Sequence, residues 1–474
     1  MKIVLSYLWK PAFIIIPFIL GLLGFTMAGD SPLQAVYQCI CLYGMGQKDV
    51  PPNVLVEIAR WLAPLATAGG IVLLMKELRR SVHAWFARLT GKSVAVFGPK
   101  GEKELLLKAL GMRGIDMDKR PVKAKRYILL GNDEENFDYY RTHLKKTQKD
   151  VFIKCSSLPA QASDHDKLHL FSPEEIAARL FWKEYCPYEL SVRNGHCLQI
   201  VLIGFGKLGK ELLLTALQNN IFDAKQHIEY HVIGSENGFR QIYHQLDQID
   251  DPVHFYSGSW FDYMQTIRQA HMVIVAEQEG QLSLMRDLML SLPEKKIHVL
   301  SGRSDGMAML SDQGDLGCFD WKNKAMNPDY ILCERLNEYA KRVNLRYAHL
   351  YDGVAETEEN MQVQWQKLNT FTRYSNISAA DYHSVQLCML GDHPLTDEKL
   401  EWLAELEHIR WCRYHYLNNW TCGTPENGKN KDSSKRIHQS LIPYAQLLQT
   451  EKEKDRENIR LLLKLDRDIS NSIL

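Results

Sequence analysis

Residues near position 410 have the types and spacing needed to bind a nucleotide. The stretch 403–420 reads LAELEHIRWCRYHYLNNW and places Glu407 and Arg410 three residues apart on one face of a predicted helix. His408 and Trp411 share a second stripe of that helix. A guanidinium can hold a phosphate and an aromatic ring can stack on a base, so this pattern predicts a ligand site.

A polar loop over residues 421–438 follows this helix and carries several lysines. Beside aromatic side chains its charges can hold phosphates, although tryptophans commonly lie in a core and lysine-rich loops commonly face water. Both interpretations stay open at this point. The candidate ligand-binding residues are Glu407, His408, Arg410, Trp411, Trp420, Lys435, Arg436, His438 and Tyr444.

A glycine-rich turn forms a second candidate site. Gly204, Gly206 and Gly209 fit the pattern G-x-G-x-x-G in the segment IVLIGFGKLGKELL, between a predicted strand and a predicted helix. Such glycines allow a tight turn and let the backbone approach a pyrophosphate at the helix N-terminus. Glu236, after the next strand, can bind a ribose hydroxyl. We expect NAD(H) or another nucleotide here; the alternative is a Rossmann scaffold that has lost its ligand.

Two apolar stretches, residues 11–28 and 54–78, are long enough to predict membrane-spanning helices. Glu57 and Arg60 lie near the start of the second stretch, three residues apart, where they can pair or face a water-filled path. A cleaved secretory signal is the alternative for the first stretch. The second stretch argues against that alternative.

The segment between these stretches predicts a short helix that begins at Pro32 and stops at Gly44, followed by a glycine-bearing loop. The order span, half-helix, loop, span resembles the pore unit of two-span potassium channels. Tyr43, Gly44 and Gly46 then occupy the place of the selectivity filter. Their motif, LYGMG, departs from the Thr-Val-Gly-Tyr-Gly of that family, so potassium selectivity is not implied. A two-helix anchor with an extracytoplasmic loop is the alternative.

Basic residues over 76–92 follow the second stretch, and the positive-inside rule puts them in the cytoplasm. We therefore expect a multi-pass protein of the inner (cell) membrane with lipid contacts and a large cytoplasmic C-terminal region. An apolar stripe through Trp85 predicts that the second helix continues and packs against the next domain or a neighbouring subunit. The predicted pore or gate residues are Tyr43, Gly44, Gly46, Glu57, Arg60, Gly69 and Gly70.

Chain length, net charge and cysteine count limit the number of domains and the kinds of partner that we expect. Its 474 residues allow three or four domains at roughly 100–200 residues each. The formal net charge is zero, so no nucleic-acid partner is indicated. The ten cysteines show no metal-binding spacing and fit a reduced compartment, so we predict no metal site.

Apolar strands alternate with helices between residues 93 and 302, which predicts two doubly wound parallel α/β units. The predicted strands are 93–98, 126–133, 150–155, 197–203, 228–234, 271–277 and 296–302. The turn of the first unit, GPKGEKE, lacks the nucleotide motif. The segment IVLIGFGKLGKELL resembles the TrkA/RCK family, the cytoplasmic Rossmann domains that gate potassium channels and transporters. The resemblance covers residues 199–300 and, more loosely, 93–155. It implies a homo-oligomer, a tetramer by analogy, whose cytoplasmic layer moves when occupied and pulls on the pore helices.

The C-terminal part resembles the RyR domain, a small helical repeat named after the ryanodine receptor and also found in bacteria. The segments ELEHIRW, NNWTCG, KRIHQSLIPY and EKEKDRENI carry the resemblance, which covers about residues 356–465. It implies sensing of a nucleotide-type signal in conflict or antiviral defence systems.

The sequence thus predicts a multi-domain protein: a two-span α-helical pore segment over 1–90, Rossmann-like domains over 91–195 and 196–355, and an α-helical RyR domain over 356–474. We expect a ligand-gated ion channel or pore-forming effector opened by a nucleotide or NAD-derived signal, and no enzymatic activity. One alternative is a membrane-anchored nucleotide-binding regulatory or scaffolding protein without conduction. Others are NAD(H) sensing at Gly204–Gly209 with a purely assembling RyR domain, and an anchored NAD-dependent oxidoreductase.

Overall fold

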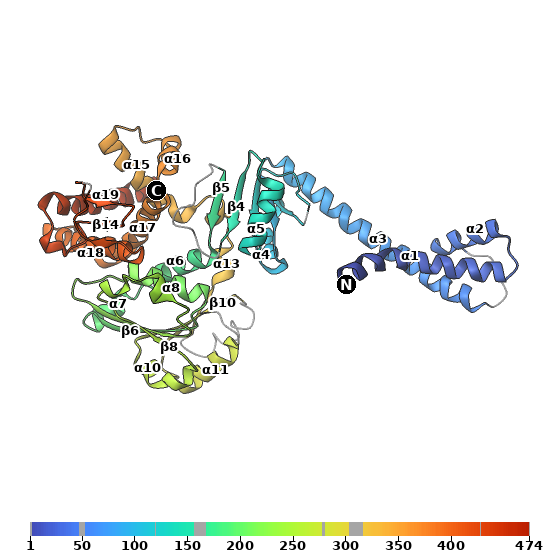
Figure 1. Ribbon diagram of the computed structural model, residues 1–474, viewed down its shortest axis with the longest axis horizontal. Coiled ribbons are helices and arrows are strands. Elements are labelled where there is room, and N and C mark those ends of the chain that lie inside the picture. The colour runs from blue at the N-terminus through green and yellow to red at the C-terminus, as the bar shows by residue number, and fades with distance from the viewer. Residues whose placement is uncertain are drawn as a thin grey trace. The chain divides into compact units, whose positions relative to one another are not determined.

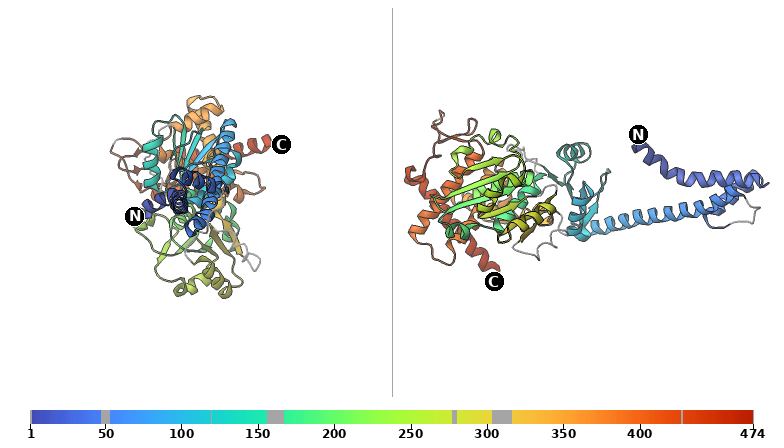
Figure 2. Two further views of the ribbon diagram at one scale, coloured as in Figure 1. Left: turned by 90° about the vertical axis from the view of Figure 1, so that its right-hand side faces the viewer. Right: turned by 90° about the horizontal axis from the view of Figure 1, so that it is seen from below.

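The computed structural model falls into two compact units, Met1–Ser93 and Val94–Leu474. Figure 1 labels many of the helices and strands of both units, and Figure 2 gives two further views of them. The residues described are 2–46, 53–118, 120–155, 167–276, 280–302, 316–426 and 428–473.

The N-terminal unit consists of three helices, α1 (Lys2–Met27), α2 (Pro32–Tyr43) and α3 (Val54–Leu89). The short helix agrees with the half-helix predicted from the sequence: Pro32 is at its first turn and Gly44 ends it. The long helices α1 and α3 pack together, and α2 lies against both. Close approach depends on Gly24, because a Cβ there would lie 2.6 Å from a Val56 methyl group. The prediction that the helix of the second apolar stretch continues beyond residue 78 is confirmed by α3.

The outer faces of α1 and α3 are apolar. Ile15, Ile19 and Leu23 on α1, and Trp61 and Leu65 on α3, are all exposed. Among the residues described, however, no helix is both long enough and apolar enough to cross a membrane. The described part of the chain therefore does not support the two membrane spans predicted over residues 11–28 and 54–78.

The first sheet of the second unit has the strand order β2-β1-β3-β4-β5. All its neighbouring strands are parallel. This order is that of a doubly wound fold. Its elements are β1 (Val94–Phe97), α4 (Lys100–Leu110), β2 (Gly114–Asp116), β3 (Arg126–Leu129), α5 (Asp133–Tyr139), β4 (Asp150–Lys154) and β5 (Leu168–Phe171).

The second sheet is also parallel and has the order β11-β10-β9-β6-β7-β8. Counted along the chain from β6, this is the 3-2-1-4-5-6 order of a Rossmann fold. The two sheets confirm the predicted pair of Rossmann-like units. The elements are β6 (Cys197–Ile203), α8 (Lys207–Asn219), β7 (His227–Ile233), β8 (Val253–Tyr256), β9 (Met272–Val275), α11 (Gln281–Ser291), β10 (Ile297–Ser301) and β11 (Leu316–Asp320).

A layer of C-terminal helices packs on α8 and on α6 (Pro173–Glu184), which lie between it and the second sheet (Figure 1). The layer consists of α15 (Glu338–Asp352), α16 (Glu358–Lys367), α17 (Thr370–Leu390), α18 (Asp397–Leu417) and α19 (Gln449–Ile473). A small sheet of β12 (Thr421–Cys422), β14 (Ile437–His438) and β13 (Lys431–Asp432) lies between α18 and α19 in the chain.

Buried polar contacts fasten this helical layer to the second sheet. Arg413 Nη1 of α18 pairs with Asp251 Oδ2 at 2.6 Å, and both side chains are almost completely buried. The Tyr382 hydroxyl of α17 donates to the Ile221 carbonyl at 2.8 Å. One continuous apolar core runs through both sheets and into α17 and α18. The helical layer and the Rossmann-like sheets are therefore one packed body.

Candidate functional site

Helix α18 presents the residues around position 410. It begins after Thr396, whose side chain accepts a hydrogen bond from the Lys399 backbone N–H, as a helix cap does. Leu403 and Leu406 are buried, as their spacing predicts. Glu407, His408, Arg410 and Trp411 of the same helix line a cavity.

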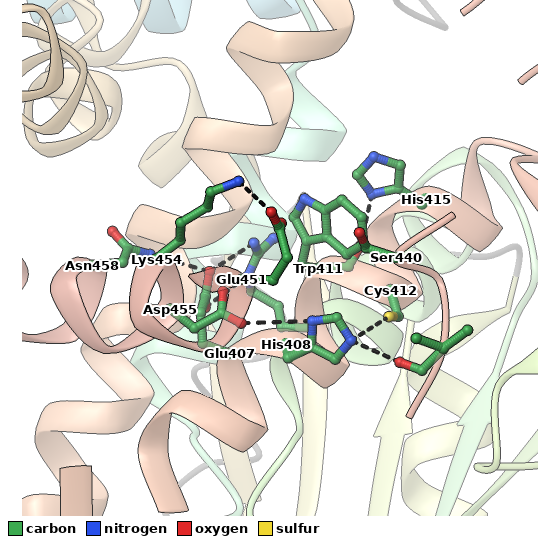
Figure 3. Close-up of polar contacts among 12 residues, drawn as sticks. Glu407, His408, Trp411, Cys412, His415, Ser440, Glu451, Lys454, Asp455 and Asn458 are labelled. Atoms are coloured by element: carbon green, nitrogen blue, oxygen red, sulfur yellow. Dashed lines mark hydrogen bonds and ion pairs between the residues drawn. The ribbon is translucent and has the colours of Figure 1, made fainter. Parts of the chain in front are cut away.

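This cavity has a volume of about 340 Å³ and lies among four helices of the C-terminal layer. Figure 3 shows part of its wall, with α18 and α19 contributing most of the polar side chains. The lining residues are Val343 and Tyr347 of α15; Ser375, Asn376 and Ala379 of α17; Glu407, His408, Arg410 and Trp411 of α18; His438, Ser440 and Leu447; and Glu451, Lys454, Asp455 and Asn458 of α19.

Glu407 and Arg410 form a buried ion pair within α18. Arg410 Nε and Nη2 donate to the two carboxylate oxygens of Glu407 at 2.9 and 2.8 Å. Arg410 Nη1 donates to Ser378 Oγ of α17 at 3.1 Å, and Arg410 is 1% exposed. A bidentate pair of this kind fixes both side chains. Arg410 therefore shapes the cavity wall, and most of its donors are already used.

His408 and Asp455 form a second polar contact across the cavity (Figure 3). His408 Nε2 lies 2.8 Å from the Ile442 carbonyl, which accepts a hydrogen bond, so Nε2 carries the proton of the neutral ring. Burial lowers the pKa of His408. Burial, together with the Glu407 charge, raises the pKa of Asp455 to about 8. His408 Nδ1 lies 3.6 Å from Asp455 Oδ2. Near neutral pH this contact joins two uncharged groups.

Aromatic rings gather around Trp411. Its indole is 4.0 Å from the His415 ring and 4.9 Å from the His438 ring, between centroids. The Ser440 backbone N–H donates to His438 Nδ1 at 3.1 Å, so Nε2 carries the proton of that ring. Burial lowers the pKa of His438 to about 4 and that of His415 to about 3. These imidazoles are neutral donors and acceptors at physiological pH.

The cavity brings together five of the nine predicted ligand-binding residues: Glu407, His408, Arg410, Trp411 and His438. Trp420 is buried and stacks on Phe371, 5.1 Å away. Tyr444 is also buried, 5.9 Å from the His408 ring. Both support the cavity from behind, as core residues do.

The two predicted basic residues of the loop lie away from the cavity. Lys435 Nζ pairs with Glu426 at 2.6 Å, and Arg436 Nη1 donates to the Asn418 carbonyl at 3.0 Å. The loop folds back on itself through the small sheet, so its charges meet local partners.

Sequence reasoning missed the residues of α15, α17 and α19 that complete the cavity. The signal that could have found some of them was in the RyR-like segments, where Lys454 and Asp455 stand in EKEKDRENI. Lys454 pairs with Glu451 at 2.6 Å, and its side chain is 62% exposed. It therefore supplies a cation where the cavity meets solvent.

The glycine turn has the geometry that its motif requires. A Cβ on Gly209 would lie 2.2 Å from the Gly204 carbonyl oxygen, so α8 can pack on the turn only with glycine there. A Cβ on Gly206 would meet nothing within 4 Å, so the turn is open for a ligand to approach the backbone at the start of α8. The Glu236 carboxylate accepts from the Arg240 backbone N–H at 3.0 Å and so caps a short helix. The turn can accommodate a pyrophosphate, whereas the Glu236 carboxylate predicted to bind a ribose hydroxyl already accepts a backbone hydrogen bond.

The predicted pore residues all belong to the N-terminal unit. Glu57 and Arg60 form an ion pair at 2.6 Å. The Tyr43 carbonyl, at the end of α2, accepts a hydrogen bond from Thr67 Oγ1 of α3 at 2.9 Å. Gly44 and Gly46 follow in a tight turn whose N–H groups donate to the Cys41 carbonyl. Gly69 and Gly70 lie within the unbroken helix α3.

The chain is similar to several solved structures and matches no curated protein. It is similar to the GsuK channel bound to NAD, at 11% identity and a TM-score of 0.36, over 72% of this chain and 85% of that one. It is similar to GsuK bound to ADP at 13% identity and a TM-score of 0.36, over 71% and 99% of the two chains. It is also similar to the apo structure of D-lactate dehydrogenase from Escherichia coli, at 12% identity and a TM-score of 0.23, over 56% and 98%. Sequence identities and TM-scores this low do not support an inference about function.

A family model gives a sharper result for the helical layer. Residues 393–468 match the RyR domain. This range holds α18, the small sheet and most of α19, and so most of the cavity wall. The predicted RyR domain is therefore confirmed over these residues, and the cavity is a feature of that domain and of the helices α15 and α17 that precede it.

Proposed function

We propose that this chain is a regulatory protein whose RyR-domain cavity binds a nucleotide-type small molecule. The observation that supports this most directly is the chemistry of the cavity wall. Glu407 is neutralised by Arg410, and Asp455 is protonated near neutral pH because burial raises its pKa to about 8. An interior of neutral rings, amides and hydroxyls suits an uncharged ring system with several hydrogen-bonding groups.

The polar side chains facing such a ring include Asn376, whose amide can recognise the edge of a base. Asn458 Nδ2 already donates to Glu407 Oε1 at 3.3 Å, so Asn458 offers its amide oxygen as an acceptor. Lys454 supplies the positive charge for a phosphate at the mouth of the cavity. In this arrangement the base enters the cavity and the phosphate stays near solvent. The phosphate then competes with Glu451 for the Lys454 ammonium.

The test is binding of a nucleotide panel to the full-length chain, measured by calorimetry. NAD, ADP-type and cyclic nucleotides are compared with the matching nucleosides. Lys454→Gln is expected to weaken the phosphate-bearing compound about tenfold or more, because a hydrogen bond to a charged group contributes about 1.5–3 kcal/mol. The nucleoside should lose little. Lys435→Gln is the matched control, since Lys435 lies outside the cavity wall. Equal effects of the two variants, or no binding by any compound, would contradict the proposal.

The glycine turn offers a second candidate sensor for NAD(H), supported by the open approach at Gly206 and the close packing of Gly209. Gly206→Ala preserves the fold because its Cβ meets free space, yet the added methyl group obstructs a pyrophosphate at the backbone. Loss of NAD(H) binding in Gly206→Ala, with binding intact in Lys454→Gln, would assign the sensor to the turn. The opposite result would assign it to the RyR cavity.

A pore formed by the N-terminal unit, in the inner membrane, is the output that we propose for this sensor. Its support is the predicted half-helix, observed as α2, and the exposed apolar faces of α1 and α3, which need a cover of lipid or of further copies. A central pore requires several copies, and four is the number we expect. Flux of ions through liposomes carrying the purified chain, opened by a ligand that the first experiment identifies, is the expected result. Ligand binding without flux would leave an anchored regulatory protein.

A further inference from the structure

A second cavity lies in the same unit, between the Rossmann-like helices α6 and α8 and the helices α17 and α18. Its volume is about 230 Å³, whereas a single water needs only about 10–15 Å³ of such space. Side chains from all four helices line it. It is separate from the RyR cavity, because the residues of α17 that line the two cavities are different.

The wall of this second cavity carries more negative than positive charge. Its carboxylates are Glu175, Glu211 and Asp381, and its cations are Arg179 and Lys210. Arg179 is already committed: its Nε and Nη2 donate to both oxygens of Asp381 at 2.6 and 3.0 Å. Lys210 Nζ lies 5.3 Å above the ring of Tyr243. Arg179 Nη1 also lies 3.9 Å from Glu175 Oε1, so Asp381 and Glu175 share one guanidinium. Glu211 has no ion pair among the residues described.

The other groups in the wall also suit a donor ligand. Asn219 lines the cavity and is 6% exposed, and its Oδ1 has no hydrogen-bond partner among the residues described. A buried acceptor of this kind costs free energy until a donor reaches it. Aromatic rings of Tyr243, Phe371, Tyr374 and Tyr414 surround the space, and such rings attract cations to their faces.

We propose that this cavity binds a small organic cation, an amine or guanidine, whose N–H groups donate to Glu211, Glu175 and the Asn219 oxygen. Glu175 provides negative charge, Glu211 releases its proton to solvent as the cation approaches, and the tyrosine and phenylalanine rings hold the carbon chain. Because residues of both the Rossmann-like unit and the C-terminal helices form the site, a bound cation stabilises the contact between these two layers. This inference does not depend on the ligand of the RyR cavity.

The test uses probes with similar carbon chains whose end groups are cationic, neutral or anionic. Putrescine and agmatine are added to the full-length chain, and 1,4-butanediol and succinate serve as neutral and anionic probes of matching length. Binding is measured by calorimetry and as a rise in the melting temperature. The amines are expected to bind and to raise the melting temperature, and the diol and succinate are expected to do neither.

Two isosteric variants locate the site. Glu211→Gln and Glu175→Gln are each expected to weaken amine binding at least tenfold. Glu189→Gln is the control, because this glutamate is 80% exposed and pairs with Arg193 on the surface. The melting temperature of each variant without ligand shows that it has folded. The proposal is wrong if no amine binds, if butanediol binds as well as putrescine, or if the three variants bind amines equally.

Discussion

Replacing Arg413 by methionine tests whether the helical layer and the second Rossmann-like sheet are held together by one buried ion pair. Asp251 Oδ2 accepts from Arg413 Nη1 at 2.6 Å and from Gln226 Nε2 at 2.8 Å, and Asp251 Oδ1 accepts from the Ile228 N–H at 2.9 Å. The Asp251 side chain has no exposed surface. Arg413→Met keeps much of the packing volume and leaves this carboxylate buried without its cation.

Breaking a buried pair from one side costs about 3–5 kcal/mol, because the remaining charge has lost both water and its partner. At roughly 2 °C per kcal/mol for a large domain, the melting temperature should fall by about 6–10 °C. Arg413 also donates to the Leu217 carbonyl of α8 at 3.2 Å, so the loss should lie toward the upper end of that range.

Thermal unfolding of the full-length chain measures this effect, and two further variants interpret it. Arg193→Met removes a surface pair with Glu189 and should cost less than about 1 kcal/mol. Adding Asp251→Asn to Arg413→Met removes the orphaned charge and should restore at least half of the lost stability. A decrease of less than about 2 °C in Arg413→Met, equal to that of Arg193→Met, would refute the reasoning.

Three other changes follow from the same kind of argument, and thermal unfolding measures each. Burial, with the Glu175 charge, raises the pKa of Glu211 to about 8, so between its ordinary pKa and pH 8 the folded chain keeps a proton on Glu211 that the unfolded chain has lost. The free energy of unfolding therefore falls by up to about 1.4 kcal/mol per pH unit over that range. Glu211→Gln should accordingly raise the melting temperature more at pH 8 than at pH 5. Gly209→Ala should destabilise the chain strongly, whereas Gly206→Ala should leave the melting temperature unchanged, because only the first Cβ meets backbone. Tyr382→Phe leaves a buried carbonyl without its donor and should cost about 1–3 kcal/mol.

The interior strands of both sheets were predictable from the sequence, and the edge strands were not. The predicted strands correspond to β1, β3 and β4 of the first sheet and to β6, β7, β9 and β10 of the second. Their residues are buried on both faces, so they appear as continuous apolar runs. The missed strands β2, β5, β8 and β11 all lie at sheet edges. Strands β5, β8 and β11 are mostly part-exposed, and β2 has only three residues, so no apolar run identifies them.

The candidate site shows a different limit. Helical spacing placed Glu407 with Arg410 on one face of α18 and His408 with Trp411 on a second stripe, because side-chain direction within a helix follows from sequence spacing, and all four residues line the cavity. Sequence spacing does not predict that Lys435 pairs with Glu426 whereas Lys454 lines the cavity. The position of each lysine depends on how the loop and α19 pack against the rest of the domain. Whether a basic residue binds a ligand depends on its tertiary contacts, and these contacts cannot be predicted from the charge of the surrounding sequence.

Helix α17 is the physical link between the two cavities. Ser375, Asn376 and Ala379 line the RyR cavity, and Tyr374 and Ser378, on the adjoining face of the helix, line the second one. Arg410 of the first cavity donates to Ser378 Oγ of the second, so a shift of α17 changes both walls together. A ligand shifts a conformational equilibrium only by its difference in affinity for the two states. If the two ligands favour the same position of α17, each must strengthen the other by the same factor, since coupling between binding sites is reciprocal. Measuring the amine affinity with and without the nucleotide, and the nucleotide affinity with and without the amine, should therefore give equal ratios, and Ser378→Ala should bring both ratios toward one.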